Sequence, residues 1–205
     1  MSQIKNIIFD LGGVLLNIDY NKTSNAFKKL GASSFDEFYS QAGANHLFEA
    51  LETGDITEGA FYKAMAPHCL AQTNEQQIRQ AWNSILLDFR QESLEILIQL
   101  KEKYNLYLLS NTNSIHLDAF NKILMEQTGN SSLDKYFIKS FYSHIIRLRK
   151  PYAATYQWVL KDADLKSADT LFIDDSINNI NGAKEVGLHT HLLLPNEKIE
   201  DLELL

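Results

Sequence analysis

The 205-residue sequence predicts an α/β fold: a Rossmann-like parallel sheet with an inserted, all-helical cap subdomain. Three observations predict it. Short apolar runs rich in β-branched and aromatic residues, such as Ile7–Phe9, alternate with amphipathic segments along most of the chain. Strands that alternate with helices form parallel sheets covered on both faces. One stretch, from Tyr20 to Leu87, breaks the alternation because it has helical patterns and few strand-like runs.

The composition is that of an ordinary globular protein, with 45% hydrophobic and 11% aromatic residues. The formal net charge of −7 argues against a nucleic-acid partner, because binding of a phosphate backbone draws on clustered Lys and Arg. A small phosphorylated ligand needs only one or two local cations, so acidity does not exclude it. Cys69 is the sole cysteine, which rules out an intramolecular disulfide and a cysteine-based zinc site.

The N-terminal stretch and the length of the apolar runs predict the cellular location of the protein. No basic segment followed by a long apolar stretch opens the chain, so we expect no signal peptide. No run approaches the ~18 apolar residues of a membrane span. We therefore expect a cytoplasmic protein without a membrane partner, and a monomer or weak homodimer.

The first predicted strand, Ile7–Phe9, delivers Asp10 to the start of a Gly12-Gly13 loop. Burying a carboxylate at a strand end is costly unless another group pairs with it. The glycines let a ligand approach the backbone N–H groups of this loop closely. This stretch is therefore the first candidate for a ligand site.

The helical stretch predicts a cap of residues 19–87, inserted between core segments 1–18 and 88–205. Thr57 and Asn74 each precede an amphipathic segment and suit the N-cap position of a helix. The second of these helices is expected over Glu75–Leu86, with a buried stripe of Ile78, Ala81, Trp82 and Ile85.

The strand–helix alternation resumes at Gln91. A helix with Leu94, Leu97 and Ile98 on one face precedes a short apolar strand, Leu106–Leu109. A further helix is expected from Ser114. Residues 134–143 are less distinct and predict a short edge strand, at either 136–138 or 140–142.

The last third of the chain repeats the pattern. Pro151 is expected at the first position of a helix that runs through Leu160, where its missing N–H costs nothing. Two more strands are expected over Thr170–Ile173 and Thr190–Leu194. The helix between them, from residue 177 to 186, is expected to stop at Gly187.

Polar side chains end three of the predicted strands. They are Asp10, then Ser110 and Asn111, then Asp174 and Asp175. In open parallel sheets, ligands bind outside the carboxyl ends of the strands. Three carboxylates gathered there repel one another, and a hard cation with oxygen ligands relieves that repulsion. Mg²⁺ fits because it binds through one or two carboxylates and bridges to phosphate oxygens.

Hydrogen-bond donors accompany these carboxylates. The Ser110 hydroxyl, the Asn111 amide and the Lys150 ammonium are suited to bind an anion beside the metal. An aspartate that faces a metal-held phosphoryl group can attack it and form an aspartyl-phosphate. The residues therefore point to phosphoryl transfer.

Four segments together resemble the motifs of the haloacid dehalogenase (HAD) superfamily of hydrolases, in the right order and spacing over nearly the whole chain. They are Phe9–Val14, Leu109–Thr112, Arg149–Pro151 and Phe172–Ser176. The helical insertion is similar to the C1 cap of that family. Within the superfamily, the sequence most resembles the bacterial α-D-glucose-1-phosphate phosphatase group.

This resemblance implies an Mg²⁺-dependent phosphomonoester hydrolase that acts on a small phosphorylated metabolite, such as glucose 1-phosphate, through an aspartyl-phosphate. It implies that Asp10 is the nucleophile and a metal ligand, and that the Gly12 carbonyl and Asp175 are further metal ligands. Asp174 would act on the metal through water or by contacting its ligands. Ser110 and Asn111 would bind the phosphate, and Lys150 would neutralise the charge of the phosphate and of Asp10. Asn179 would brace the fourth motif, or be an ordinary polar residue in the first turn of a helix.

Gly12 departs from the family pattern, because most phosphatases of the superfamily carry there an aspartate that serves as general acid and base. Three hypotheses remain: a phosphatase in which another group compensates, a non-catalytic or weakly catalytic phosphometabolite-binding protein, and a 2-haloacid dehalogenase. The last is disfavoured because its characteristic tyrosine is absent from position 12. Asp19, at the entrance to the cap, is either the substitute or a helix-entry carboxylate.

Five further polar residues have an open role. His46, Glu49 and Glu52 lie on a cap segment and either face the substrate or are solvated. Arg147 and Arg149 flank the predicted site lysine and either strengthen its field for anions or are solvated loop charges.

Overall fold

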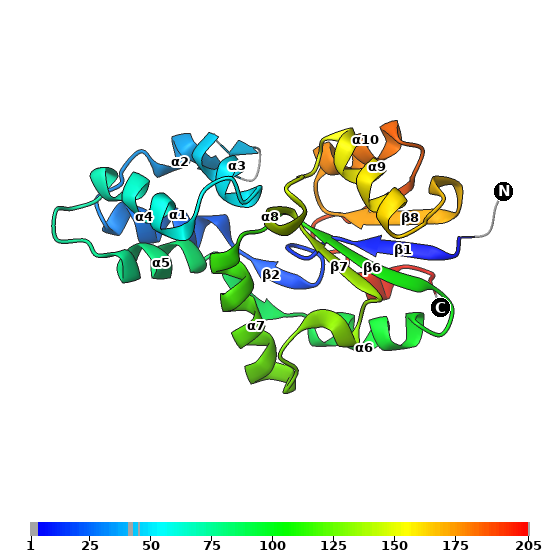
Figure 1. Cartoon of the computed structure of the whole chain (residues 1–205). Helices are drawn as coiled ribbons and strands as arrows, with labels where there is room; N and C mark the ends of the chain where they lie inside the picture. The colour runs from blue at the N-terminus through cyan, green and yellow to red at the C-terminus, as the bar shows by residue number, and fades with distance from the viewer. Residues whose placement is uncertain (1–3, 41–42, 45, 205) are drawn as a thin grey trace.

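A parallel five-stranded sheet lies at the centre of the computed structural model, which describes residues 4–40, 43–44 and 46–204. Figure 1 shows the sheet with helices above and below it. The strand order is β7-β6-β1-β8-β9. The strands are β1 (Asn6–Phe9), β6 (Asn105–Ser110), β7 (Lys139–Tyr142), β8 (Thr170–Asp174) and β9 (His189–Leu192). The predicted fold class is confirmed.

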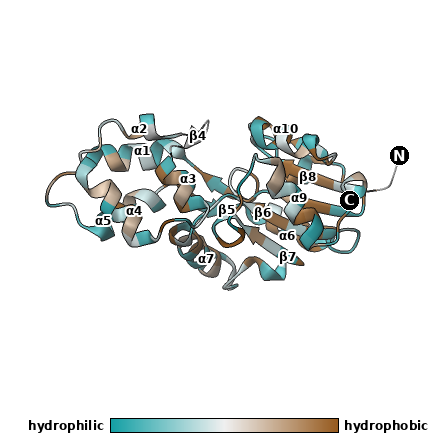
Figure 2. Cartoon of the chain, turned by 45° about the horizontal axis from the view of Figure 1, so that its top comes forward, coloured by the Kyte–Doolittle hydropathy of each residue, from teal (hydrophilic) through white to brown (hydrophobic). Residues whose placement is uncertain are grey.

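Side chains of the central strand β1 alternate between two hydrophobic clusters. Ile7 and Phe9 pack in the cluster under α6 (Gln91–Leu100) and α7 (Ser114–Thr128). Ile8 packs on the opposite face, in the cluster covered by α9 (Ala153–Asp162) and α10 (Ile177–Glu185). All three side chains are buried, as expected for a strand covered on both faces. Figure 2 shows hydrophobic residues along the strands that these helices cover.

The segment from Tyr20 to Asn83 forms a helical insertion beside the sheet (Figure 1). It consists of α1 (Tyr20–Lys29), α2 (Phe35–Phe38), α3 (His46–Glu52), α4 (Glu58–Met65) and α5 (Glu75–Asn83), with two short strands, β3 (Tyr39–Ser40) and β4 (Gly43–Ala44). It has a hydrophobic cluster of its own around Phe27, Phe48 and Trp82. Both predicted N-caps are confirmed, since the side chains of Thr57 and Asn74 accept backbone N–H groups of the following helix.

A two-stranded antiparallel ribbon connects the insertion to the sheet, and the sequence did not predict it. Its strands are β2 (Leu16–Ile18) and β5 (Leu86–Phe89). The helix expected over residues 75–86 therefore ends at Asn83, because Leu86 pairs with Ile18 and the chain continues to Phe89, which is buried in the core. The division into a core of 1–18 and 88–205 and a cap of 19–87 stays a prediction.

The segment around Pro151 differs from the prediction. Pro151 lies ahead of α9 rather than at its first position, and Tyr152 is the N-cap. The reason lies in the packing, because this segment runs against α10. A Cβ atom added to Gly182 of that helix would lie 2.0 Å from the Pro151 carbonyl oxygen.

Smaller differences concern the edges of the sheet and the helix surfaces. Of the two candidate edge strands, the one at 140–142 is correct, within β7. The last strand begins one residue earlier than expected, at His189. Ile98 is 46% exposed, and Leu100 takes the buried place at the end of α6.

The remaining elements are short: α8 (Ser143–Ile146) and 3₁₀ helices at Ala66–His68, Leu133–Lys135, Ser167–Asp169 and Ile199–Asp201. In the described part of the chain, no helix combines the length and the apolar character that a membrane span requires.

Candidate active site

Lys150 lies between two carboxylates at the carboxyl end of the sheet. Its Nζ atom is 2.6 Å from Asp10 Oδ1 and 2.7 Å from Asp174 Oδ2, and its side chain is 1% exposed. Burial alone would lower the Lys150 pKa, but the charges of Asp10 and Asp174 outweigh it, and that pKa is raised. A buried ammonium of this kind is stable only because both carboxylates are present.

Asp10, Asp174 and Asp175 form one acidic cluster. One carboxylate oxygen from each lies within 4.8 Å of the other two. Burial raises the pKa of Asp10 to about 7, with Lys150 opposing this shift and the two neighbouring aspartates adding to it. Burial, with Asp174 next, raises the pKa of Asp175 to about 6. The cluster therefore carries an electrostatic cost that a bound cation would relieve.

The three aspartates differ in what they offer a cation. Asp174 is completely buried, and its oxygens accept bonds from Lys150, the Ser176 N–H and the Asn179 amide. Asp10 and Asp175 instead line a cavity. Asn179 thus braces the fourth motif through Asp174.

The loop after β1 makes room for this cluster. Gly13 has φ +76°, and a Cβ atom built on it would lie 2.2 Å from Asp175 Oδ2. Gly12 lines the same cavity as Asp10 and Asp175. The carboxylates of Asp10 and Asp175, with the Gly12 carbonyl as the predicted third ligand, would make an all-oxygen donor set, which fits Mg²⁺.

Asn111 holds the backbone of Lys150. Its Oδ1 atom accepts the Lys150 N–H at 2.9 Å, and its Nδ2 atom donates to the Lys150 carbonyl oxygen at 2.9 Å. Asn111 also lines the cavity, and its second amide hydrogen remains for a ligand. Ser110 is 3% exposed at the end of β6, paired with Tyr142, and the described cavity wall does not include it. Its role as a phosphate ligand stays a prediction.

The cavity has a volume of about 300 Å³ and lies between the sheet and the helical insertion. The insertion contributes two carboxylates and two phenols to its wall, from Glu49, Glu52, Tyr20 and Tyr39. Both glutamates therefore face the cavity. His46 is exposed and lines a neighbouring hollow instead.

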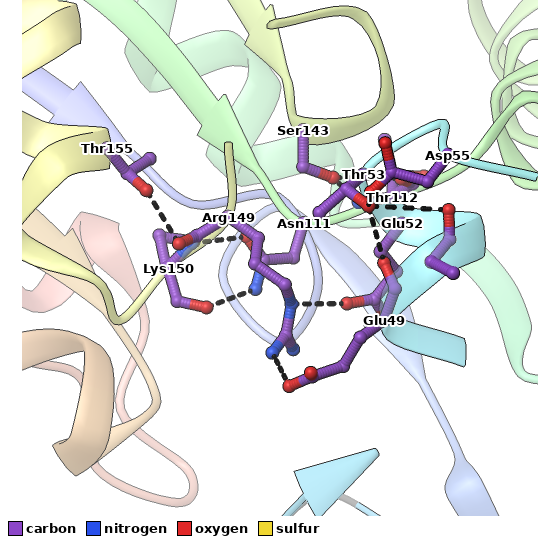
Figure 3. Close-up of polar contacts among 11 residues, drawn as sticks. Glu49, Glu52, Thr53, Asp55, Asn111, Thr112, Ser143, Arg149, Lys150 and Thr155 are labelled. Carbon is purple, nitrogen blue, oxygen red and sulfur yellow. Dashed lines mark hydrogen bonds and ion pairs between the residues drawn. The ribbon is translucent and has the colours of Figure 1, made fainter. Parts of the chain in front are cut away.

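Arg149 joins the two glutamates to the third motif (Figure 3). Its Nη1 atom is 2.6 Å from Glu49 Oε1, and its Nε atom is 3.0 Å from Glu52 Oε2. Burial raises the pKa of Glu52, and the Arg149 charge opposes the shift. A second ion pair between insertion and core joins Asp55 and Arg147. Arg149 is therefore a largely buried partner of the two glutamates, whereas Arg147, with its side chain 65% exposed, is a solvated loop charge that forms a surface ion pair.

The two phenols were not predicted from the sequence. The rings of Tyr20 and Tyr39 lie 5.7 Å apart. Burial raises the pKa of both phenols, and the charges of Asp175 and Glu52 raise the pKa of Tyr20 further. Both phenols therefore stay protonated. An aromatic residue at helical spacing is usually part of a core, and no sequence signal separates these two.

Asp19 behaves as a helix-entry carboxylate. Its side chain accepts the Asn21 N–H at 2.9 Å and caps α1. The described cavity wall does not include it. The hypothesis that Asp19 replaces the missing acid at position 12 is therefore unsupported by this geometry, because its carboxylate serves the helix.

Comparison with known proteins places this geometry in a family. Residues 4–187 match the family of haloacid dehalogenase-like hydrolases. A D-ribitol-5-phosphate phosphatase of Bacteroides thetaiotaomicron is 31% identical over 187 residues, which cover 91% of this chain and 90% of the relative. The superfamily predicted from the four motifs is confirmed.

Solved structures of HAD family proteins are also similar to this chain. A HAD family enzyme of B. thetaiotaomicron, in complex with magnesium and inorganic phosphate, is 34% identical with a TM-score of 0.88, covering 98% of this chain and 99% of that one. A predicted HAD-like family hydrolase of Porphyromonas gingivalis is 30% identical with a TM-score of 0.85, covering 97% and 94%.

A more distant structure shares the fold alone. The L-2-haloacid dehalogenase of Xanthobacter autotrophicus is 20% identical, with a TM-score of 0.63 over 95% of this chain and 80% of that one. The expected cofactor, Mg²⁺, agrees with the acidic cluster and with the magnesium complex of the B. thetaiotaomicron enzyme. The finer resemblance to the glucose-1-phosphate phosphatase group and to the C1 cap stays a prediction. On the match over residues 4–187, the chain belongs to the haloacid dehalogenase-like hydrolases.

Proposed function

We propose that the protein is an Mg²⁺-dependent phosphomonoester hydrolase that forms an aspartyl-phosphate on Asp10. The observation that carries the proposal is the position of Lys150, which binds Asp10 and Asp174 while Asp175 lines the cavity beside them. Asp10, Asp175 and the Gly12 carbonyl would hold the metal. When bound, Mg²⁺ neutralises the charge on the phosphate and on the aspartates.

The reaction follows from the residues around the phosphate. An Asp10 carboxylate oxygen attacks phosphorus, the bond to the alcohol oxygen breaks, and the leaving alkoxide takes a proton from solvent water. Water then attacks the phosphorus of the aspartyl-phosphate and loses a proton to solvent, and the P–O bond to Asp10 breaks, which releases inorganic phosphate and restores the Asp10 carboxylate. Lys150 stabilises the negative charge near Asp10, and Asn111 holds the Lys150 backbone in place.

The substrate is proposed to be a small sugar phosphate or sugar-alcohol phosphate. The B. thetaiotaomicron relative is a D-ribitol-5-phosphate phosphatase, which supports an open-chain polyol phosphate. The sequence resemblance points to glucose 1-phosphate. A cavity of about 300 Å³ suits a small metabolite of either kind. Residues 19–87 would act as a cap that closes over it and excludes water.

Gly12 favours a second candidate, a phosphometabolite-binding protein with little or no turnover. One experiment separates the two. Phosphate release from a panel containing D-ribitol 5-phosphate and α-D-glucose 1-phosphate is measured with and without Mg²⁺, for the wild type and for Asp10→Asn. We expect Mg²⁺-dependent release that Asp10→Asn abolishes.

Three results would contradict the proposal. Binding of phosphate esters without turnover would favour the binding protein, and an active Asp10→Asn variant would exclude Asp10 as nucleophile. Metal-independent release of halide from 2-haloacids would favour a dehalogenase.

A further inference from the structure

Both cationic side chains in the described cavity wall, Lys150 and Arg149, already bind carboxylates of the protein. Lys150 lies between Asp10 and Asp174. The guanidinium of Arg149 lies between two glutamates of the insertion. A ligand with a negative group besides its phosphate therefore meets no unpaired cation in this part of the wall.

The bond between Arg149 and Glu52 is shielded from water. The Arg149 side chain is 14% exposed and that of Glu52 is 9% exposed, so both charges are largely desolvated. Charge-assisted bonds of this kind are short and strong. A carboxylate ligand has to compete with Glu49 and Glu52 for the guanidinium, and displacing Glu52 would leave a buried carboxylate without its partner.

The remaining groups of the insertion favour hydroxyls. Glu49 and Glu52 outnumber the single guanidinium, so this side of the wall carries one net negative charge. Carboxylate oxygens accept hydrogen bonds from alcohols, and the protonated phenols of Tyr20 and Tyr39 can donate to them. A second anionic group would be repelled at the same place.

We propose that Glu49 and Glu52 act as specificity-determining residues that admit phosphate esters of neutral, hydroxyl-rich alcohols and reject esters carrying a second anionic group. Rejection arises because the two glutamates occupy Arg149 and add like charge, so specificity rests on repulsion as much as on attraction. This inference rests on the proposed phosphatase function and names its substrate class.

The test uses two esters that differ in one group. D-Ribitol 5-phosphate ends in a hydroxymethyl group, and D-ribonate 5-phosphate carries a carboxylate in its place. For the wild type with Mg²⁺, we expect kcat/KM to be at least about 100-fold lower for the ribonate ester, because like charges at a binding surface are strongly disfavoured. D-Sorbitol 6-phosphate and 6-phosphogluconate form a second matched pair.

Variants of the two glutamates test whether these residues cause the preference for the uncharged ester. Glu49→Gln and Glu52→Gln keep the size of the side chain and remove its charge, and each is expected to bring the ratio between the two esters to within about tenfold. Glu37→Gln is the matched control. Glu37 is exposed on α2 of the same insertion, so this change removes the same charge away from the cavity and is expected to leave the ratio at its wild-type value.

Each outcome decides between alternatives. Equal kcat/KM for the paired esters in the wild type, or an unchanged ratio in both glutamine variants, would overturn the inference. If no ester is hydrolysed, the proposed function fails. Calorimetric binding of the two esters to the Asp10→Asn protein with Mg²⁺ then still tests whether the cavity rejects a second anionic group. Thermal melts verify that the variants are folded.

Discussion

The side-chain amide of Asn111 binds the Lys150 backbone on both sides of its Cα atom, with two hydrogen bonds of 2.9 Å. The two residues are 39 positions apart in the sequence. Asn111, which follows β6, thereby fixes the position of the Lys150 backbone, from which the side chain extends to Asp10 and Asp174. Asn111 acts as a positioning residue, in addition to lining the cavity.

Replacing Asn111 by alanine should therefore affect stability as well as turnover. Asn111→Ala leaves the Lys150 N–H and carbonyl without their partners, at a cost of about 1–3 kcal/mol in the free energy of unfolding. Urea denaturation measures this loss. Asn178→Ala, at an exposed position of the cavity wall, is the control and should cost less than about 0.5 kcal/mol. Equal stability of the two variants would contradict the positioning role.

Removing the site lysine should destabilise the protein strongly. Lys150→Met keeps an unbranched side chain, shorter by one atom, but leaves two buried carboxylates without their counter-charge, at a cost of about 3–5 kcal/mol. Mg²⁺ should recover part of the loss because it supplies positive charge to the same cluster. The measurement is urea unfolding with and without Mg²⁺, with Lys184→Met on the exposed face of α10 as the control. A Lys150→Met protein as stable as that control would disprove the electrostatic account.

Gly13→Ala should abolish Mg²⁺ binding. The new Cβ atom would lie 2.2 Å from Asp175 Oδ2, so the carboxylate must move out of the cluster. Gly129→Ala is a matched control, since its φ of +74° gives similar backbone strain while nothing lies within 4 Å of the added atom. Both variants should lose about 1 kcal/mol to strain. Only Gly13→Ala should lose the rise in melting temperature on adding Mg²⁺, and retention of that rise would refute the proposed metal site.

His116 should make stability depend on pH. Its ring stacks on Trp82 with centroids 4.6 Å apart, Nδ1 lies 2.9 Å from Asn83 Oδ1, and burial lowers its pKa to about 3. An unfolded histidine titrates near ~6.5, so between these values the unfolded state binds more protons. Stability is therefore lost as pH falls below ~6.5, by about 2 kcal/mol at pH 5.

The His116→Gln variant tests this origin of the pH dependence. It should be less stable than the wild type at pH 7 but lose about 2 kcal/mol less between pH 7 and pH 5. His189→Gln, at an exposed position, should follow the wild-type pH profile. Parallel profiles for the wild type and His116→Gln would assign the pH dependence to other groups.

The sequence predicted those parts of the site that a strand presents directly. Asp10 and Asp174 stand at the ends of apolar runs, and parallel pairing brings such ends to one edge. The ribbon of β2 and β5 escaped prediction because each strand is too short to show a period and its partner lies about 70 residues away. The contacts of Arg149 with Glu49 and Glu52 join residues 100 and 97 positions apart, and no local pattern encodes them.

Pro151 and Gly182 touch through their backbones, with no room for a side chain between them. The lysine-bearing segment and the helix of the fourth motif therefore cannot be varied independently. A mutational library that randomises the residues around Lys150 has to retain glycine at position 182, or sample both positions jointly. Among homologous chains, a larger residue at that position is expected to coincide with a different path of the lysine segment, and therefore with a different way of bringing positive charge to the aspartate at position 10.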